Sequence, residues 1–139
     1  MVQKYQNKLL SILQIVVVLT LIACDNKRDS SDLYGQWQLI EWRNNDGIVV
    51  KTKEDRIFYC CQLSLLQLTY HHYCRYRETP DYIIIEAAYY NQYDTDTPIE
   101  LEELEDYGIP SDGVFRIQKL NDDDLVLSGS NGTLRFRKY

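Results

Sequence analysis

His71 and His72 are the side chains of this chain best suited to acid–base or metal chemistry. Neighbouring residues of a strand point to opposite faces, so the two imidazoles cannot hold one metal ion together. His72 and Cys74 share a face and could both bind zinc, but two ligands do not complete a zinc site. Ser64 and Ser128 lie in apolar strand contexts, and the sequence lacks the Gly-x-Ser-x-Gly turn of many hydrolases. We therefore predict a protein that is not an enzyme and has no cofactor or metal.

Paired carboxylates of the glycosidase type remain an open alternative, because their spacing is set in three dimensions. Eleven acidic residues and no basic residue lie between Arg77 and Arg116. This segment predicts a solvated acidic face, which could also dock a basic partner protein. A calcium site is not favoured, since the twelve-residue loop pattern is absent. The eleven residues are Glu78, Asp81, Glu86, Asp94, Asp96, Glu100, Glu102, Glu103, Glu105, Asp106 and Asp112.

Cys60, Cys61 and Cys74 are three thiols, so at least one of them must stay unpaired if they form disulfides among themselves. Cys60 and Cys61 point to opposite faces of a strand, so only one of them could meet Cys74 across a hairpin. Two readings stay open, a disulfide to Cys74 or buried free cysteines that act as small apolar residues.

Tyrosine is abundant, and Tyr59, Tyr73 and Tyr89 are our candidates for lining a ligand cup. A tyrosine ring offers an apolar face and one hydroxyl, which suits an amphipathic or sugar-like ligand. The alternative is that these tyrosines cover half-buried strand surfaces, where tyrosine is also favoured.

The amino-terminal segment has the pattern of a secretory signal peptide. Lys4 and Lys8 precede a mostly apolar run at residues 9–23. Fifteen residues are few for a membrane-spanning helix, which needs about 20. The run ends in Leu-Ile-Ala-Cys, which looks like a bacterial lipobox with Cys24 as the lipidated residue. We expect cleavage before Cys24 and attachment to a membrane through its acyl chains.

Cleavage after residue 23 would leave 116 residues with 13 basic and 21 acidic side chains, a net charge of −8. An acidic chain is not expected to bind nucleic acid through phosphate contacts. Residues 24–32 consist of Cys24 and a polar stretch, which predicts a flexible tether. Residues 33–139 are then long enough for one domain with one core.

The domain reads as short strands separated by turns. Strands are expected at residues 36–43, 48–53, 70–77, 82–90, 114–120, 125–128 and 133–139, with a strand pair or one bent strand at 56–68. Asn-Asn-Asp-Gly at 44–47 predicts a hairpin turn. A change of apolar parity between Leu65 and Leu66 suggests a bulge. Ile83, Ile85, Ala87 and Tyr89 are expected to share one face.

One helix is expected at residues 97–107. Thr97 would be its N-cap, Pro98 the first helical residue and Glu100 the capping-box partner, and Gly108 would end it. About eight strands with one short helix favour an all-β fold, a closed antiparallel barrel or a sandwich.

Gly35-Gln36-Trp37 opens the first strand and arginines occupy the last one, a combination that resembles the lipocalins and their calycin relatives. The resemblance implies a small antiparallel lipocalin-like β-barrel, closed at one end by Gly35 and Trp37. It also implies a late arginine, Arg135 or Arg137, across the indole ring. "RIFYCCQLSLLQL" and the final twenty residues are similar to small lipocalin-like lipoproteins of anaerobic Gram-negative bacteria. The domain is shorter than ligand-carrying lipocalins and has no matching disulfide.

These features predict a lipid-anchored lipoprotein of the outer membrane, facing either the periplasm or the cell surface, that holds a small apolar or amphipathic ligand in a barrel cup. The alternative function is an interaction module whose acidic face meets a basic protein of the cell envelope.

Overall fold

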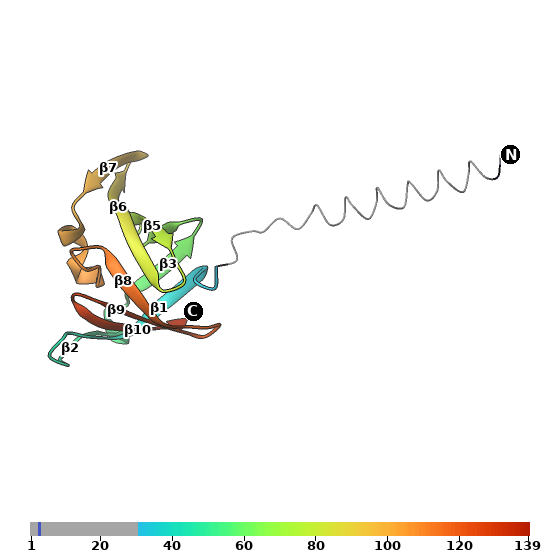
Figure 1. Cartoon of the computed structure of the whole chain (residues 1–139). Helices are drawn as coiled ribbons and strands as arrows, with labels where there is room; N and C mark the ends of the chain where they lie inside the picture. The colour runs from blue at the N-terminus through green and yellow to red at the C-terminus, as the bar shows by residue number, and fades with distance from the viewer. Residues whose placement is uncertain (1–2, 4–30) are drawn as a thin grey trace. The chain divides into compact units, whose positions relative to one another are not determined.

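The computed structural model describes residue 3 and residues 31–139, and the latter fold as ten antiparallel strands and two short 3-10 helices (Figure 1). The elements are β1 (Gly35–Arg43), β2 (Val49–Thr52), η1 (Lys53–Asp55), β3 (Phe58–Gln62), β4 (Leu65–Gln67), β5 (His72–Glu78), β6 (Tyr82–Gln92), β7 (Thr95–Ile99), η2 (Leu101–Tyr107), β8 (Val114–Leu120), β9 (Asp124–Gly129) and β10 (Gly132–Lys138). In this described part, no helix is long and apolar enough to cross a membrane. The predicted signal peptide and tether, Cys24 included, lie outside the described residues.

The sheet closes on itself because β1 pairs on both sides. β10 runs along one side of β1, and β3 and then β2 run along the other. Around the ring the order is β10, β9, β8, β6, β5, β4, β3 and β1, while β2 and β7 lie off it. The prediction of an all-β antiparallel fold with about eight strands in a closed sheet is confirmed.

Apolar side chains fill the interior of this ring. Trp37, Leu39, Phe115, Leu125 and Leu134 are all completely shielded from solvent, as strand alternation requires for inward positions. Burial of each large apolar side chain stabilises the fold by about 1.5–3 kcal/mol. The ring is therefore held together by a packed core.

The turn at residues 44–47 has the predicted hairpin form. Gly47 adopts a positive φ of 76°, and the Asn44 side chain accepts hydrogen bonds from the backbone N–H groups of Asp46 and Ile48. These bonds return the chain into β2.

The predicted bulge between Leu65 and Leu66 is wrong. Leu63 and Ser64 both have positive φ, 50° and 63°, and form a two-residue turn between β3 and β4. The chain reverses at this turn, and the reversal changes the parity of its apolar residues. For residues 56–68 we expected a pair of strands or one bent strand, and the pair of strands is correct. A primed hairpin turn usually carries glycine or asparagine, and their absence here hid the turn.

A bulge does occur in β6. The register with β5 shifts between Arg75 and Tyr76, opposite Ala87 and Ile85. Ala88 therefore faces the core in place of Ala87, and the expectation that Ala87 shares a face with Ile83 and Ile85 is wrong.

The expected helix at residues 97–107 begins later and is of another type. Thr97 and Pro98 belong to β7, where they pair with Tyr90 and Tyr89 of β6. Proline is tolerated because β7 is an edge strand. The 3-10 helix η2 follows, with Glu100 as its N-cap, and it ends at Gly108 as predicted, with a φ of 84°. Pairing with β6 outweighs the local capping signal.

Candidate functional site

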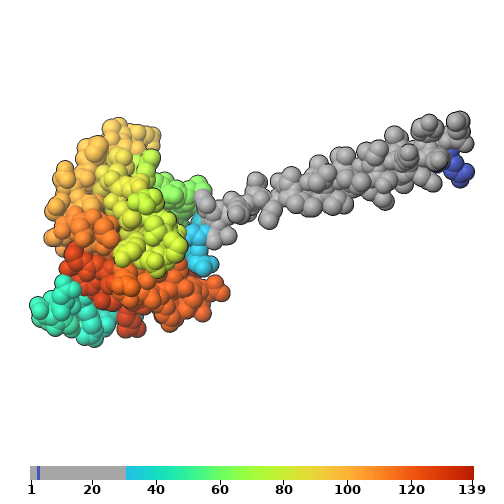
Figure 2. Space-filling view, viewed as in Figure 1, coloured from blue at the N-terminus to red at the C-terminus, as the bar shows by residue number. Residues whose placement is uncertain are grey.

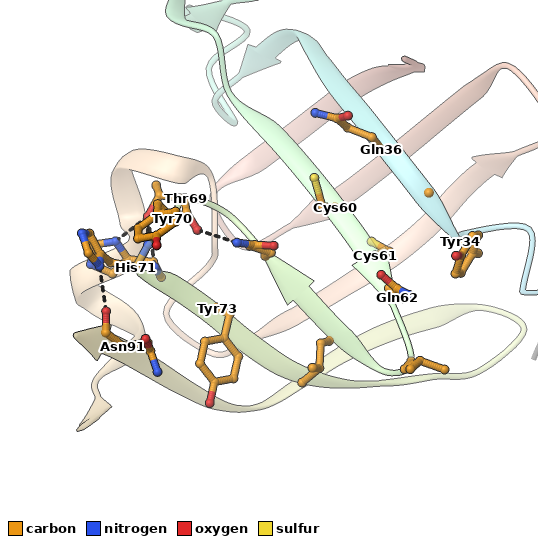
Figure 3. A pocket seen from close by; sticks show the side chains of 15 residues that line it. Tyr34, Gln36, Cys60, Cys61, Gln62, Thr69, Tyr70, His71, Tyr73 and Asn91 are labelled. Atoms are coloured by element: carbon orange, nitrogen blue, oxygen red, sulfur yellow. Dashed lines mark hydrogen bonds between the residues drawn. The ribbon is translucent and has the colours of Figure 1, made fainter. Parts of the chain in front are cut away.

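A cavity of about 700 Å³ lies against the outward-facing side chains of β3 and β4 and the turn at residues 69–72 (Figure 3). We call it the outer groove. In Figure 3 Tyr34 stands at one end, and Tyr70 and His71 stand at the other. Its volume lies in the usual range for small-molecule sites. The lining residues are Tyr34, Gly35, Gln36, Cys60, Cys61, Gln62, Leu63, Leu65, Gln67, Thr69, Tyr70, His71, His72, Tyr73 and Asn91.

None of these fifteen residues carries a formal charge with its histidines neutral, although a quarter of the whole chain is charged. Aromatic and imidazole rings are combined with the side-chain amides of Gln36, Gln62, Gln67 and Asn91. Such a surface can stack against a flat apolar face and exchange hydrogen bonds with a neutral polar group.

The turn at residues 69–72 is fixed by the hydroxyl of Thr69. Its Oγ1 accepts hydrogen bonds from the backbone N–H groups of His71 and His72, at 3.2 and 3.0 Å. The hydroxyl hydrogen is then available for Nδ1 of His72, which lies 3.0 Å away. His72 therefore accepts at Nδ1 and, as a neutral ring, carries its proton at Nε2.

His71 has the opposite tautomer. Its Nδ1 lies 2.7 Å from the backbone carbonyl of Asn91, and because a carbonyl can only accept, Nδ1 must carry the proton. Nε2 of the neutral ring is then an acceptor. The ring packs edge-on against Tyr70, with centroids 5.0 Å apart, and lies tilted against Tyr90, with centroids 5.4 Å apart. Aromatic and imidazole rings thus form this end of the groove.

Asp96 of β7 orients two polar groups of the outer groove. Its Oδ1 accepts a hydrogen bond of 2.6 Å from the Asn91 amide, and its carboxylate also accepts one from the Tyr73 hydroxyl. Partial burial, and then this bond to Asp96, raise the pKa of Tyr73 to about 12. The bonds from Asn91 and then Tyr73 lower the pKa of Asp96. The phenol therefore stays protonated and points its hydrogen at Asp96.

The three tyrosines predicted to line a cup lie in different places. Tyr73 lines the outer groove, and Tyr89 stacks on it with ring centroids 5.2 Å apart. Tyr59 is 2% exposed inside the ring, and its hydroxyl donates a hydrogen bond of 2.8 Å to the carbonyl of Tyr107. Tyr59 does not line the outer groove. It also does not line a second cavity of the described residues, which lies beside Trp42 and Asn131.

Sequence reasoning missed the amide side chains of the groove, but a signal existed. Residues 57–74 contain no charged residue over eighteen positions, in a chain that is otherwise rich in charge. Most of the groove comes from this segment.

The cation that lies over the indole ring of Trp37 is Lys138, where an arginine was predicted. Nζ of Lys138 lies 4.3 Å from the centroid of the indole and also donates to the carbonyl of Tyr34. Arg135 and Arg137 point away from the core because they alternate with buried residues, and they contact Glu41 and Gln38. The arginine expectation is therefore wrong for both residues.

Gly35 and Trp37 both belong to β1, and the expectation that they close one end of the ring stays a prediction. The indole N–H donates a hydrogen bond of 2.8 Å to the carbonyl of Leu33. A Cβ at Gly35 would lie 2.8 Å from Nζ of Lys138, so a glycine leaves room for the lysine to cross.

The three cysteines are free thiols in this structure. Cys61 and Cys74 are buried on either side of Leu66, while Cys60 is partly exposed in the outer groove. Burial raises the pKa of Cys61 and of Cys74 to about 12. Residues 31–139 contain no group of three or more histidine, cysteine or acidic side chains placed to hold a metal ion.

Comparisons with known proteins agree with this architecture. A family model described as a lipocalin-like domain matches residues 17–139. A solved lipocalin-like protein from Bacteroides uniformis is 24% identical with a TM-score of 0.57, and the match covers 78% of this chain and 100% of that one. A solved uncharacterised protein from Bacteroides eggerthii is 25% identical with a TM-score of 0.53, covering 76% and 98%. None of the curated proteins compared matches the chain.

Proposed function

Because the chain belongs to the lipocalin-like domain family, we propose that it is a non-enzymatic protein that binds a small amphipathic ligand. The lipocalin-like fold suggests a binding protein. We further propose that the protein is a lipoprotein of the cell envelope, attached to the outer membrane through acyl chains on Cys24.

The outer groove is the observation that carries the binding function. It combines rings, amides and two exposed leucines, Leu63 and Leu65, in one cavity of about 700 Å³. The interior of the ring is filled by core side chains such as Trp37 and Tyr59. We therefore place the ligand in the outer groove, whereas the sequence predicted a cup inside the ring.

Cys60 provides a test that does not depend on knowing the ligand. It lines the groove and is partly exposed, so a bound molecule should slow its alkylation by N-ethylmaleimide. The purified full chain would be screened against lipids, detergents and neutral glycosides, with alkylation at Cys60 followed by mass spectrometry. Protection by at least one class of compound supports the proposal. Alkylation that no compound slows contradicts it.

A matched control separates occupation of the groove from general stabilisation. Substitution of Tyr73, which lines the groove, should abolish the protection. Substitution of Tyr93, which is 91% exposed and lies outside the groove, should leave it unchanged. Equal effects of both substitutions would contradict a site in the groove.

The lipid anchor has a separate test. We expect the mass of the membrane-extracted protein to show loss of residues 1–23 and addition of acyl chains at Cys24. The Cys24→Ser variant should lack the acyl mass and leave the membrane fraction. A secreted wild-type product without fatty acid would contradict the anchor and leave the binding function untouched.

An acidic docking surface is the second candidate function. Glu100, Glu102, Glu103, Glu105 and Asp106 are all exposed at the start of and along η2. In Figure 2 this segment, gold to orange, forms part of the visible surface. A basic partner would bind here with an affinity that falls steeply with salt. An oligolysine peptide can test this role. If it binds equally well after the glutamates along η2 are replaced by glutamines, the acidic docking surface is contradicted.

A further inference from the structure

We propose that the outer groove binds a neutral, hydroxyl-rich ligand, a saccharide, in preference to a fatty acid or an ionic amphiphile. This inference rests on the proposed binding function, since it names the ligand class of the same groove. Three features carry it: the absence of charge, the arrangement of hydrogen-bonding atoms and the exposed aromatic rings.

The lining offers an ionic ligand no charged side chain, and the neighbouring charges of Asp96 and Lys138 are already bonded to lining residues. None of its fifteen residues is a lysine, arginine, aspartate or glutamate. A carboxylate or an ammonium group would lose water on entering the groove and gain no ion pair in return, which makes its burial unfavourable. The chemistry of the groove thus selects against charged ligands of either sign.

A purely apolar ligand also fits poorly. An acyl chain lying in the groove would cover the amides of Gln36, Gln62 and Gln67 and remove their water without replacing its hydrogen bonds. Polar groups placed at intervals along a ring-lined groove are instead suited to a ligand with polar groups at intervals of its own.

Four side chains of the groove each donate a hydrogen bond to another group of the protein. Gln67 donates to the carbonyl of Thr69, His71 to that of Asn91, and Tyr73 and Asn91 to the Asp96 carboxylate. Within residues 31–139, Oε1 of Gln67, Nε2 of His71 and Oδ1 of Asn91 accept no hydrogen bond, and the Tyr73 oxygen can still accept one. The groove is therefore rich in fixed acceptors, which require a ligand that donates.

Hydroxyl groups meet this requirement without charge. A hydroxyl donates one hydrogen bond and accepts others, so it can also use the second N–H of each amide. Because Asp96 and the turn at residues 69–72 hold the acceptors in place, little ordering is needed when the ligand arrives.

The aromatic rings supply the apolar part of the contact. Tyr70 is 88% exposed at the edge of the groove, and Tyr34 is 51% exposed at its other end. The negative face of such a ring attracts the C–H groups on the flat side of a sugar ring. A saccharide presents both C–H faces and hydroxyl edges, whereas an acyl chain presents only C–H groups.

The test compares hexasaccharides that differ in charge. The full chain would be titrated with cellohexaose, maltohexaose and galactohexaose as neutral probes. Hexagalacturonate is the anionic probe, the glucosamine hexamer the cationic probe and palmitate the apolar probe. Affinity would be measured by calorimetry, and occupation of the groove by slowed alkylation of Cys60. We expect at least one neutral hexasaccharide to bind and protect Cys60, at least tenfold tighter than its charged counterparts, with little dependence on salt.

Two substitutions locate the contact. Tyr73→Phe keeps the ring and removes the oxygen, and Gln67→Leu keeps the approximate size and removes the amide, so each should weaken neutral-sugar binding about threefold to tenfold. Tyr93→Phe is the control, because Tyr93 lies outside the groove, and it should have no effect. Thermal unfolding of all three variants shows whether they remain folded.

The outcomes separate the two proposals. Protection of Cys60 by palmitate or a charged hexamer, with no neutral sugar binding, overturns the saccharide assignment and keeps the groove as a binding site. No protection by any probe or screened compound overturns both. Sugar binding that Tyr73→Phe and Gln67→Leu leave unchanged overturns the assignment to this groove.

Discussion

Tyr59 is the residue at which the core of this fold can be tested most directly. It lies inside the ring, with its ring centroid 4.6 Å from that of Phe136 and 6.4 Å from that of Phe115. Its hydroxyl donates to the carbonyl of Tyr107 at the end of η2, 2.8 Å away. This one bond joins the strand β3 to the helix that follows β7.

Tyr59→Phe keeps the ring packing and removes only the hydroxyl. The variant loses one partly buried hydrogen bond and leaves the Tyr107 carbonyl without its partner, which we expect to lower the free energy of unfolding by about 1–3 kcal/mol. For a domain of this size, each 1 kcal/mol lowers Tm by about 4 °C. Urea unfolding followed by tryptophan fluorescence would measure the change. Tyr139→Phe is the matched control, because Tyr139 is 73% exposed, and it should stay within about 0.5 kcal/mol of wild type.

The pH dependence adds a second, independent readout. Burial, followed by the nearby thiols of Cys74 and Cys61, raises the pKa of Tyr59 well above its usual value. Above pH 10 the unfolded chain releases the phenol proton while the native protein keeps it, so the native state binds more protons and stability falls as pH rises. The contribution of Tyr59 is fully present below pH 10 and declines by up to about 1.4 kcal/mol per pH unit above it.

The difference in stability between wild type and Tyr59→Phe should therefore be constant from pH 7 to 9 and shrink above pH 10. Both proteins share the buried cysteines, whose effect cancels in the difference when a reductant is present. A difference that stays constant up to pH 11, or a variant as stable as wild type at pH 8, would refute the placement of this hydroxyl in the core.

Three further predictions concern the surroundings of Trp37 and the thiols. Lys138→Met should lower the free energy of unfolding by about 1 kcal/mol through loss of the charge over Trp37, whereas Arg137→Met should change it by less than about 0.5 kcal/mol, as urea unfolding would show. Gly35→Ala should lower the free energy of unfolding by about 1–3 kcal/mol, because φ at this position is 122°. Adding Lys138→Ala should relieve the contact of 2.8 Å between the new Cβ and Nζ of Lys138 but leave the backbone strain. A double variant as stable as Lys138→Ala alone would contradict this account. N-ethylmaleimide at pH 8 should label Cys60 first and reach Cys61 and Cys74 only on unfolding, since burial raises the pKa of these two thiols to about 12; mass spectrometry of the peptides checks the order.

Much of the fold could be predicted because its causes are local. Alternating apolar residues and the turn at residues 44–47 were sufficient to predict an antiparallel all-β chain. The turn at Leu63 and Ser64 was not found, because neither residue type favours positive φ. The capping box at Thr97 is a genuine helix signal, but hydrogen bonds to β6 override it, and those bonds depend on residues that only the folded sheet brings near.

The candidate site was less predictable because it is assembled from distant parts of the chain. Asp96 orients Tyr73 and Asn91 only because β7 folds back onto β6, beside β5. The position of Lys138 over Trp37 could have been predicted from the sequence, however. Lys138 has the same parity as the buried Leu134 and Phe136, so alternation alone points it toward the indole and points Arg135 and Arg137 outward.

The pairing of β1 with β10 has a consequence for biosynthesis. A ribosome makes residue 37 about a hundred residues before residue 138, its partner across the sheet. During that interval the N–H and C=O groups on one side of β1 are unpaired, and strands from other molecules can pair with them. We therefore expect a product truncated before Gly132 to aggregate more readily than the full chain.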